Sequence, residues 1–405
     1  MEKVNLSTQD YIALENQYGA HNYKPLDVVL ERGEGIWVWD VEGKKYLDFL
    51  SAYSAVNQGH RHPRILQAMI DQANKLPLTS RAFRNDQLPL LAKELCEATG
   101  YERMLPMNSG AEAVETALKL VRKWGYKVKG VPNGQAEIIA CTGNFSGRTI
   151  SIITFSDEEQ YKDGFGPFTP GFKLVPYGDA DALEAAITSN TIAFLFEPVQ
   201  GEGGVIVPPE GYAKRVREIC DEHNVLMIAD EIQSGLGRTG KLFAVDYDEV
   251  RADVVTIGKA LSGGFYPVSA VLADSDLMDM FQPGDHGSTF GGNPLGAAIA
   301  REALAVLHDE GLIDNAYEMG EYLMGRLRRL ESPHIKEVRG RGLLIGVELH
   351  DSAGGARRFC EALKEKGLLC KETHHTVIRF APPLTITKEE IDWALDRIEP
   401  VLMMD

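Results

Sequence analysis

The chain has 405 residues, of which 44% are hydrophobic and 25% are charged, and its formal net charge is −17 at pH 7. This length exceeds that of one typical domain, so we expect either two cores or one large α/β core. The excess of acidic side chains repels nucleic-acid phosphates and anionic lipid headgroups, which argues against a protein that binds nucleic acid or a membrane surface.

The cysteines and the N-terminus indicate a reducing compartment. There are five cysteines, and no two of them form a C-x-x-C pair, which disfavours a disulfide framework or a zinc ribbon. The N-terminal stretch lacks the apolar segment of a signal peptide and the Arg-rich pattern of a transit peptide. No run of apolar residues approaches the roughly 20 that a membrane span needs. We therefore expect a cytoplasmic protein.

Within the first 300 residues, the hydrophobic pattern changes at about residue 105. Residues 35–50 alternate around a turn, as in a hairpin, and a helix is predicted at about 63–75. From about residue 105, short apolar runs alternate with amphipathic helices. The runs begin at Ile138, Ile192, Val225, Val254 and Val268, and the helices occupy residues 113–124 and 212–224. Nearly continuous apolar strands between helices predict a mostly parallel sheet that is covered on both faces.

The last hundred residues predict a second, smaller α+β unit. It consists of helices at 301–310 and 316–330, strands at 342–349 and 376–383, and a last helix at 388–402. We expect the N-terminal hairpin to join this unit rather than the central sheet. The expected organisation is an N-terminal segment of the small domain at 1–52, a large domain at 53–300, and the rest of the small domain at 301–405.

Two of the predicted strands end on an acid and a lysine. Asp230 follows the run at 225–229, and Lys259 follows the run at 254–257. In open α/β sheets ligands bind at the carboxyl ends of the strands, so both side chains would face one crevice. Taken singly, such a lysine is more often a surface residue, and such an aspartate is more often a helix cap. Pyridoxal 5′-phosphate (PLP) explains the pair, because its aldehyde needs an amine and its pyridine nitrogen needs a carboxylate that keeps it protonated.

Two segments are candidates for binding a phosphate. Ser109-Gly110-Ala111-Glu112 opens a predicted helix, whose N-terminal N–H groups suit an anion. Ser109 and Glu112 also match a capping box, which needs no ligand but leaves free donors at that end. Residues 235–241 nearly match the P-loop of nucleotide-binding proteins, but Leu242 stands where the metal-binding hydroxyl belongs. The histidines lack the usual ligand spacing, so no metal site is expected.

Long motifs around the strand-end acid and lysine resemble the class III (subgroup II) aminotransferases of PLP fold type I. They read Ile228-ADEIQSGLGRTG followed by Asp253-VVTIGKALSGG, and the likeness extends from Tyr18-GAHNY to Phe380-APPL. Within this class the chain is most similar to the ornithine δ-aminotransferases. The resemblance implies the fold type I architecture, PLP as the cofactor, and a homo-oligomer, at least a dimer, whose subunits share active sites.

The resemblance also implies which residues hold the cofactor. Lys259 corresponds to the Schiff-base lysine, which also moves the proton, and Asp230 corresponds to the partner of the pyridine nitrogen. The other implied contacts are Gln233 to the ring hydroxyl, Ser109, Gly110 and Ala111 at the phosphate, Phe145 on the pyridine face, and Ser288 and Thr289 at the phosphate of the neighbouring subunit. Ser146 follows the stacking aromatic, at a position where the family often has a bulkier residue.

Five further positions are implied to select the substrate. Tyr23 and Arg148 match residues that hold the α-amino and α-carboxylate ends of ornithine, and Tyr53 matches one that distinguishes ornithine from γ-aminobutyrate. Glu202 and Arg379 match a salt-bridged switch. When paired, they hide a cation from ornithine, and when Glu202 moves away, Arg379 can bind the α-carboxylate of 2-oxoglutarate.

The implied reaction transfers the δ-amino group of L-ornithine to 2-oxoglutarate. The products are glutamate and glutamate 5-semialdehyde, which cyclises to pyrroline-5-carboxylate. The alternative within the class is an aminotransferase for acetylornithine or another ω-amino acid. The remote alternative is a non-catalytic metabolite-binding protein of the same fold. We expect Glu197 to position the strand end or the loop of Glu202 rather than to act in catalysis.

Overall fold

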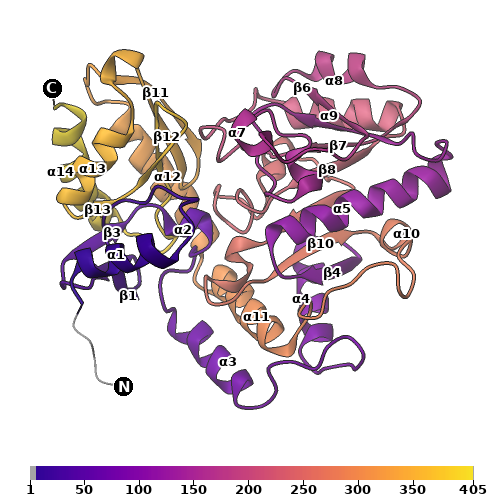
Figure 1. The fold of residues 1–405 in the computed structure, drawn as a ribbon, viewed down its shortest axis with the longest axis horizontal. Helices are drawn as coiled ribbons and strands as arrows, with labels where there is room; N and C mark the ends of the chain where they lie inside the picture. Colours follow the sequence, from indigo (N-terminus) through magenta and orange to yellow (C-terminus); the bar gives the residue numbers. More distant parts are fainter. Residues whose placement is uncertain (1–5, 405) are drawn as a thin grey trace.

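The computed structural model describes residues 6–404 and contains three β-sheets (Figure 1). Residues 1–5 and residue 405 lie outside the described residues. Residues 1–5 begin the predicted N-terminal segment, in which no targeting signal is expected. Within residues 6–404 every helix is too short or too polar to span a bilayer.

The largest element is a seven-stranded sheet with the strand order β4-β10-β9-β8-β7-β5-β6. The five strands from β9 to β6 run parallel, and β10 is antiparallel to both of its neighbours. The strands are β4 (Arg103–Met107), β5 (Glu137–Cys141), β6 (Phe172–Val175), β7 (Thr191–Phe196), β8 (Leu226–Asp230), β9 (Val254–Ile257) and β10 (Ser269–Ala273). The predicted mostly parallel sheet of an α/β fold is confirmed.

Helices cover both faces of this sheet because neighbouring strand residues point in opposite directions. Ile138 and Val254 pack with the apolar face of α5 (Gly110–Trp124). Ile139 and Val255 belong to the opposite cluster, which contains the buried residues of α9 (Tyr212–Glu222) and α11 (Pro294–Asp309). Strands that are apolar on both faces give the near-continuous hydrophobic runs of the sequence.

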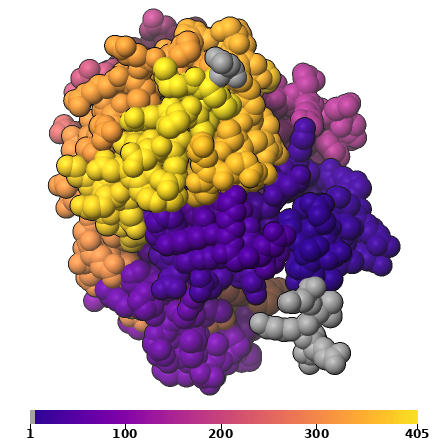
Figure 2. Space-filling view, turned by 90° about the vertical axis from the view of Figure 1, so that its left-hand side faces the viewer, coloured from indigo at the N-terminus to yellow at the C-terminus, as the bar shows by residue number. Residues whose placement is uncertain are grey.

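Two four-stranded sheets, β1-β2-β3-β13 and β11-β12-β15-β14, form the second region. Strands β2 (Trp37–Asp40) and β3 (Lys45–Asp48) form the predicted hairpin. β3 also pairs in parallel with β13 (Leu368–Leu369), so an N-terminal and a C-terminal segment share a sheet, and in Figure 2 the purple part of the chain lies against the yellow part. This pairing supports the proposal that residues 1–52 belong to the small domain. The remaining strands are β1 (Leu30–Glu34), β11 (Ile335–Arg341), β12 (Leu344–Leu349), β14 (Lys371–Thr373) and β15 (Val377–Phe380).

The second proposed domain limit falls inside a helix. α11 begins seven residues before Arg301 and packs against α3 (Pro63–Ala73) and α4 (Leu88–Thr99) of the large region. We therefore propose a limit near residue 310.

The other helices are α1 (Thr8–Tyr18), α2 (Ser51–Ser54), α6 (Ile150–Ile153), α7 (Glu159–Lys162), α8 (Ala180–Ala186), α10 (Ser275–Met278), α12 (Leu312–Leu327), α13 (Arg357–Glu365) and α14 (Lys388–Leu402), with short π- or 3₁₀-helical turns η1 (Gly125–Lys129), η2 (Ala244–Asp248), η3 (Lys259–Ser262) and η4 (Asp351–Ala353).

The segment that nearly matches a P-loop joins the two regions. Arg238 is fully buried there, and its guanidinium donates to the backbone oxygens of Leu343 (3.0 Å) and Pro382 (2.6 Å) and to Oδ1 of Asn57 (2.6 Å). Burial lowers the pKa of Arg238 to about 9. The contacts tie the chain after β8 to the small domain, so packing accounts for this segment without a nucleotide.

Within the second region, the backbone of α12 touches the turn between β11 and β12 at two glycines. A Cβ on Gly320 of α12 would lie 2.1 Å from the carbonyl oxygen of Gly342, whereas a Cβ on Gly325 of the same helix would meet nothing within 4 Å. We expect Gly320→Ala to lower the free energy of unfolding by about 1–3 kcal/mol, because overpacking would push two backbones apart. Gly325→Ala should instead raise it by up to about 1 kcal/mol, because alanine favours helix. Urea unfolding followed by circular dichroism measures both, and equal effects would contradict the packing argument.

Candidate active site

Asp230 and Lys259 line one cavity of about 190 Å³ at the carboxyl ends of β8 and β9. The strand-end rule that paired them in the sequence is the reason they meet, since parallel neighbours end at the same edge of a sheet. Four other residues implied to hold the cofactor line the same cavity: Gly110, Ala111, Phe145 and Gln233. Its remaining walls are Ser146, Gly147, Glu197 and Ile232.

Asp230 is the last residue of β8 and is only 4% exposed. Burial raises the pKa of its carboxyl group, and three hydrogen bonds oppose that rise. Ser146 Oγ donates to Oδ2 at 2.9 Å, while Thr256 Oγ1 and the backbone N–H of Ile232 donate to Oδ1 at 3.1 and 3.2 Å. Donors of this kind stabilise the charged form of a carboxyl group. They let Asp230 serve as a fixed anion at the end of an apolar strand.

Lys259 follows β9 and begins η3 with a φ of +42°. Such a left-handed backbone is uncommon in residues other than glycine and tends to occur at functional positions. Burial lowers the pKa of Lys259, and the nearby carboxylates of Glu202 and Asp230 partly oppose this effect. Its amine has no hydrogen bond or ion pair with any of residues 6–404. A partly desolvated amine that borders a cavity is suited to nucleophilic attack on a carbonyl.

The N-terminus of α5 forms another wall of the cavity. Ser109 caps the helix by accepting from the N–H of Glu112 (3.2 Å), and Glu112 Oε2 accepts from the N–H of Ser109 (2.8 Å), so the predicted capping box is present. The first N–H groups of a helix have no partner within it, and those of Gly110 and Ala111 border the cavity. Ser109 lines an adjoining cavity of about 310 Å³ that Gly110 and Lys259 share.

These features fit PLP. The unpartnered amine of Lys259 can bond its aldehyde, the carboxylate of Asp230 can hold its ring nitrogen, and the start of α5 can bind its phosphate. Gly147, with a φ of +133°, keeps the phosphate end open, since a Cβ there would come within 2.9 Å of the Cβ of Ala111.

Phe145 is held in place by a buried glutamate. Its backbone N–H donates to Glu197 Oε1 at 2.8 Å, so Glu197 positions the aromatic residue rather than the loop of Glu202. Burial, together with the charge of Asp230, raises the pKa of Glu197 to about 8. Beside Phe145, the guanidinium carbon of Arg148 lies 3.4 Å from the ring centroid of Tyr161. Tyr161 has no signal in the sequence, because only the fold brings it against Arg148.

Glu202 and Arg379 form an ion pair of 2.5 Å between Oε1 and Nη1. Arg379 lies in β15 with 0% exposure, and its Nε has no partner among residues 6–404. Burial alone would raise the pKa of Glu202, but the charges of Arg379 and Lys259 and the hydrogen bond from Arg379 together hold the pKa below its usual value. The pair is therefore ionised at neutral pH.

Tyr53 lies under this ion pair. Its ring centroid is 4.9 Å from the guanidinium carbon of Arg379, and its carbonyl oxygen accepts from Gln233 Nε2 at 3.4 Å. Residues 51–54 all have a positive φ. A left-handed turn of four non-glycine residues is costly, so its presence beside the cavity indicates a functional constraint on Tyr53.

Several residues implied to act in the site do not line the Asp230–Lys259 cavity: those around the ion pair (Tyr53, Arg148, Glu202 and Arg379) and also Tyr23, Ser288 and Thr289. Tyr23 is 79% exposed, and Thr289 is exposed as well. Ser288 Oγ accepts from Asn108 Nδ2 at 2.8 Å, next to the start of α5. Their roles stay predictions that depend on ligand and on a second subunit.

Comparison with known proteins identifies the family. The family model described as aminotransferase class III matches residues 18–402. The chain belongs to the class III aminotransferases. A Brevibacillus brevis protein named ornithine aminotransferase is 59% identical over 402 residues, which are 99% of each chain.

Solved structures agree with this class III aminotransferase over nearly its full length. The ornithine aminotransferase of Toxoplasma gondii has a TM-score of 0.97 and 49% identity, covering 98% of this chain and 94% of its own, and it holds PLP at partial occupancy in its active site. An acetylornithine aminotransferase from Elizabethkingia anophelis has a TM-score of 0.89 and 49% identity, covering 98% and 99%. The predicted family, fold and PLP cofactor are confirmed.

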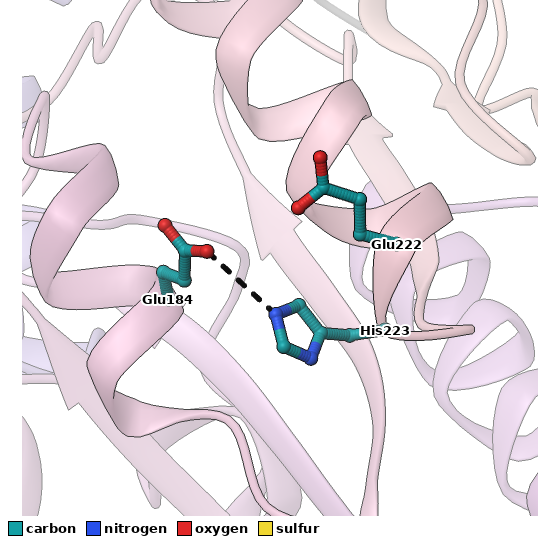
Figure 3. Close-up of side chains that lie close together, drawn as sticks. All are labelled: Glu184, Glu222 and His223. Atoms are coloured by element: carbon teal, nitrogen blue, oxygen red, sulfur yellow. Dashed lines mark ion pairs between the residues drawn. The ribbon is translucent and has the colours of Figure 1, made fainter.

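One group of side chains within residues 6–404 is close enough to hold a metal ion, and it lies away from the cavity lining. It consists of Glu184 of α8 with Glu222 and His223 at the end of α9 (Figure 3). Glu184 already pairs with Arg215 at 2.8 Å and with His223 at 3.8 Å. Because Arg215 supplies the positive charge that this carboxylate needs, we assign no metal to the class III aminotransferase here.

The raised pKa of Glu197 predicts a pH-dependent stability. The folded protein binds this proton more tightly than the unfolded chain, so the Glu197 contribution to the free energy of unfolding falls as the pH rises from about 4.5 to about 8. Glu197→Gln keeps an acceptor for Phe145 and has no proton to lose. We expect the variant to gain roughly 1–3 kcal/mol over the wild-type protein between about pH 5 and about pH 8, measured by urea unfolding.

A surface glutamate provides the control for this measurement. Glu361 pairs with Arg357 at 2.7 Å, and its pKa is lowered, so it is charged over the whole pH range of the experiment. Glu361→Gln should therefore keep a constant offset from wild type. A constant offset for Glu197→Gln as well would show that Glu197 does not titrate in this range.

Proposed function

We propose that this class III aminotransferase transfers the δ-amino group of L-ornithine to 2-oxoglutarate. The buried Glu202–Arg379 pair beside the Lys259 cavity is the observation that carries the proposal. The similarity to proteins named ornithine aminotransferase over nearly the whole chain supports it. The products would be glutamate and glutamate 5-semialdehyde, which cyclises to pyrroline-5-carboxylate.

When bound, PLP supplies a conjugated ring that accepts electrons from the substrate carbon. Asp230, held by its three donors, would keep the ring nitrogen protonated, and Phe145 would contact the ring. The N–H groups of Gly110 and Ala111 would hold the phosphate. The Nζ of Lys259 would carry the proton that the transfer moves, a task that its lowered pKa favours.

The ion pair gives the site two substrate-binding states. With Glu202 on Arg379, no free cation meets the dibasic substrate, and Tyr23 and Arg148 hold its α-amino and α-carboxylate ends. When Glu202 turns away, the guanidinium offers parallel donors to the α-carboxylate of 2-oxoglutarate. The unpartnered Nε of Arg379 is one such donor.

We infer that the active form is a homo-oligomer, at least a dimer, in which Ser288 and Thr289 reach the phosphate of the neighbouring subunit. Exposed aromatic side chains support this inference: Phe83 is exposed, and so is Phe290, next to Thr289. Apolar surface of this kind suits an interface between subunits. The five unpaired cysteines support a cytoplasmic location, where thiols stay reduced.

An assay of each half-reaction tests the substrate. With ornithine and 2-oxoglutarate, we expect pyrroline-5-carboxylate, trapped as its coloured adduct with o-aminobenzaldehyde, and much slower turnover of N-acetylornithine and γ-aminobutyrate. The nearest rival is an acetylornithine aminotransferase, the name that one of the similar solved structures carries. Turnover of N-acetylornithine without pyrroline-5-carboxylate from ornithine would favour the rival. Lys259→Ala should lose both turnover and the visible absorption band, and a variant that kept them would contradict the role of Lys259.

The switch makes a separate prediction about Glu202. In Glu202→Gln the side chain keeps its size but no longer neutralises Arg379, so ornithine meets a free cation. We expect kcat/KM of the ornithine half-reaction to fall roughly tenfold or more, about 1.4 kcal/mol in the transition state. The glutamate half-reaction should keep or gain rate. Glu361→Gln is the matched surface control and should change neither, whereas equal losses in both half-reactions would contradict the switch.

A further inference from the structure

We propose that Ser146 is a positioning residue that fixes the carboxylate of Asp230 in the orientation that the ring nitrogen of PLP requires. The inference rests on the proposed PLP-dependent transamination and deepens it. Sequence comparison with the family marks Ser146 only as a small residue at a position that is often bulkier, and assigns it no task.

The hydrogen bonds of Asp230 divide unequally between its two oxygens. Oδ1 receives Thr256 Oγ1 and the N–H of Ile232, whereas Oδ2 receives only Ser146 Oγ, at 2.9 Å, among residues 6–404. A carboxylate oxygen can accept two hydrogen bonds. Oδ1 is therefore filled, and Oδ2 keeps one free acceptor position for a donor in the cavity that Ser146 and Asp230 both line.

The backbone on either side of Ser146 is fixed. On one side, the N–H of Phe145 is bound by Glu197 Oε1 at 2.8 Å. On the other, Gly147 has a φ of +133° and packs so tightly on Ala111 that a Cβ would come within 2.9 Å. Both neighbours are thus held and Ser146 is only 7% exposed, and in this setting its hydroxyl donates to Asp230.

Ser146 provides a hydrogen-bond donor to Oδ2 of Asp230, and its side chain is small enough to leave the cavity open for the cofactor ring. A side chain with one heavy atom beyond Cβ reaches the carboxylate from the wall, and the cavity stays open beside Phe145. Without the hydroxyl, Oδ2 would be buried with no donor until the ring arrived. Burial would then raise the pKa of Asp230 further, and part of the protein would carry a neutral Asp230 that cannot hold a pyridinium.

Ser146→Ala tests this role in the PLP-loaded enzyme. We expect the dissociation constant for PLP, titrated by absorbance, to rise roughly tenfold, in line with a lost hydrogen bond to a charged group. We also expect the visible band of the bound cofactor to shift and its pH profile to move. With ornithine, kcat should fall more than KM rises, because ring protonation matters most in the transition state.

Two further variants separate positioning from packing at the same site. Ser146→Thr keeps the hydroxyl and should restore the band and the PLP affinity. Ser146→Cys keeps the shape with a weaker donor and should give intermediate values, so it replaces the alanine variant if that variant does not fold.

The adjacent carboxylate provides a matched control. Ser234, also buried, donates to Glu231 Oε2 at 2.6 Å, the same interaction one residue along the chain and outside the cavity lining. Ser234→Ala should leave the band and the PLP affinity unchanged, whatever it does to stability. Wild-type spectra and affinity in Ser146→Ala, or equal changes in Ser234→Ala, would overturn the proposal. A wild-type protein that binds PLP but does not use ornithine would overturn the substrate assignment alone.

Discussion

The site depends on keeping a carboxylate charged where water is nearly absent. Burial favours the neutral form of Asp230, and three donors from separate parts of the chain oppose it. Thr256 comes from the neighbouring strand β9, Ile232 from the turn after β8, and Ser146 from the loop after β5. The parallel strand order brings these segments to one edge of the sheet. The carboxylate of Asp230 has its three donors only because of this strand order.

The same edge combines groups whose protonation states differ. Burial lowers the pKa of Lys259, so its amine binds a proton less tightly. Burial raises the pKa of Glu197 to about 8, so its carboxyl group binds a proton more tightly. Glu202 stays charged because the positive charges of Arg379 and Lys259 lie near it. This arrangement provides an amine that releases its proton more readily than a free lysine, a carboxylic acid that is neutral near pH 7 and holds the Phe145 backbone, and an ion pair. Distinct environments within one cavity thus give side chains of similar chemistry separate tasks.

Sequence patterns predicted the parts of the molecule that local rules govern. Apolar runs marked β5 and β7 to β10, and a capping box marked the start of α5. Sequence patterns did not predict the long-range contacts. β13 has only two residues, too few for a periodic signal, yet it pairs with β3, which lies more than three hundred residues earlier in the chain. Likewise the contact of Ser146 with Asp230 joins residues 84 positions apart. The substrate positions came from family resemblance alone, and Tyr23 shows why, since it is 79% exposed and does not line the Asp230–Lys259 cavity.

The buried arginine explains why substrate selection can work as an exchange. Removing the partner of a buried charge is strongly destabilising unless another anion replaces it. Arg379 lies in β15 of the small domain, and Glu202 lies in the loop after β7 of the large one, so the pair crosses the junction between them. Under the proposed function, Glu202 therefore leaves only when a ligand carboxylate takes its place. In that proposal a dibasic amine cannot supply the carboxylate at Arg379 while Arg148 holds its own, and a dicarboxylate can. In this proposal the enzyme distinguishes the substrates of the two half-reactions because leaving Arg379 unpaired is energetically unfavourable.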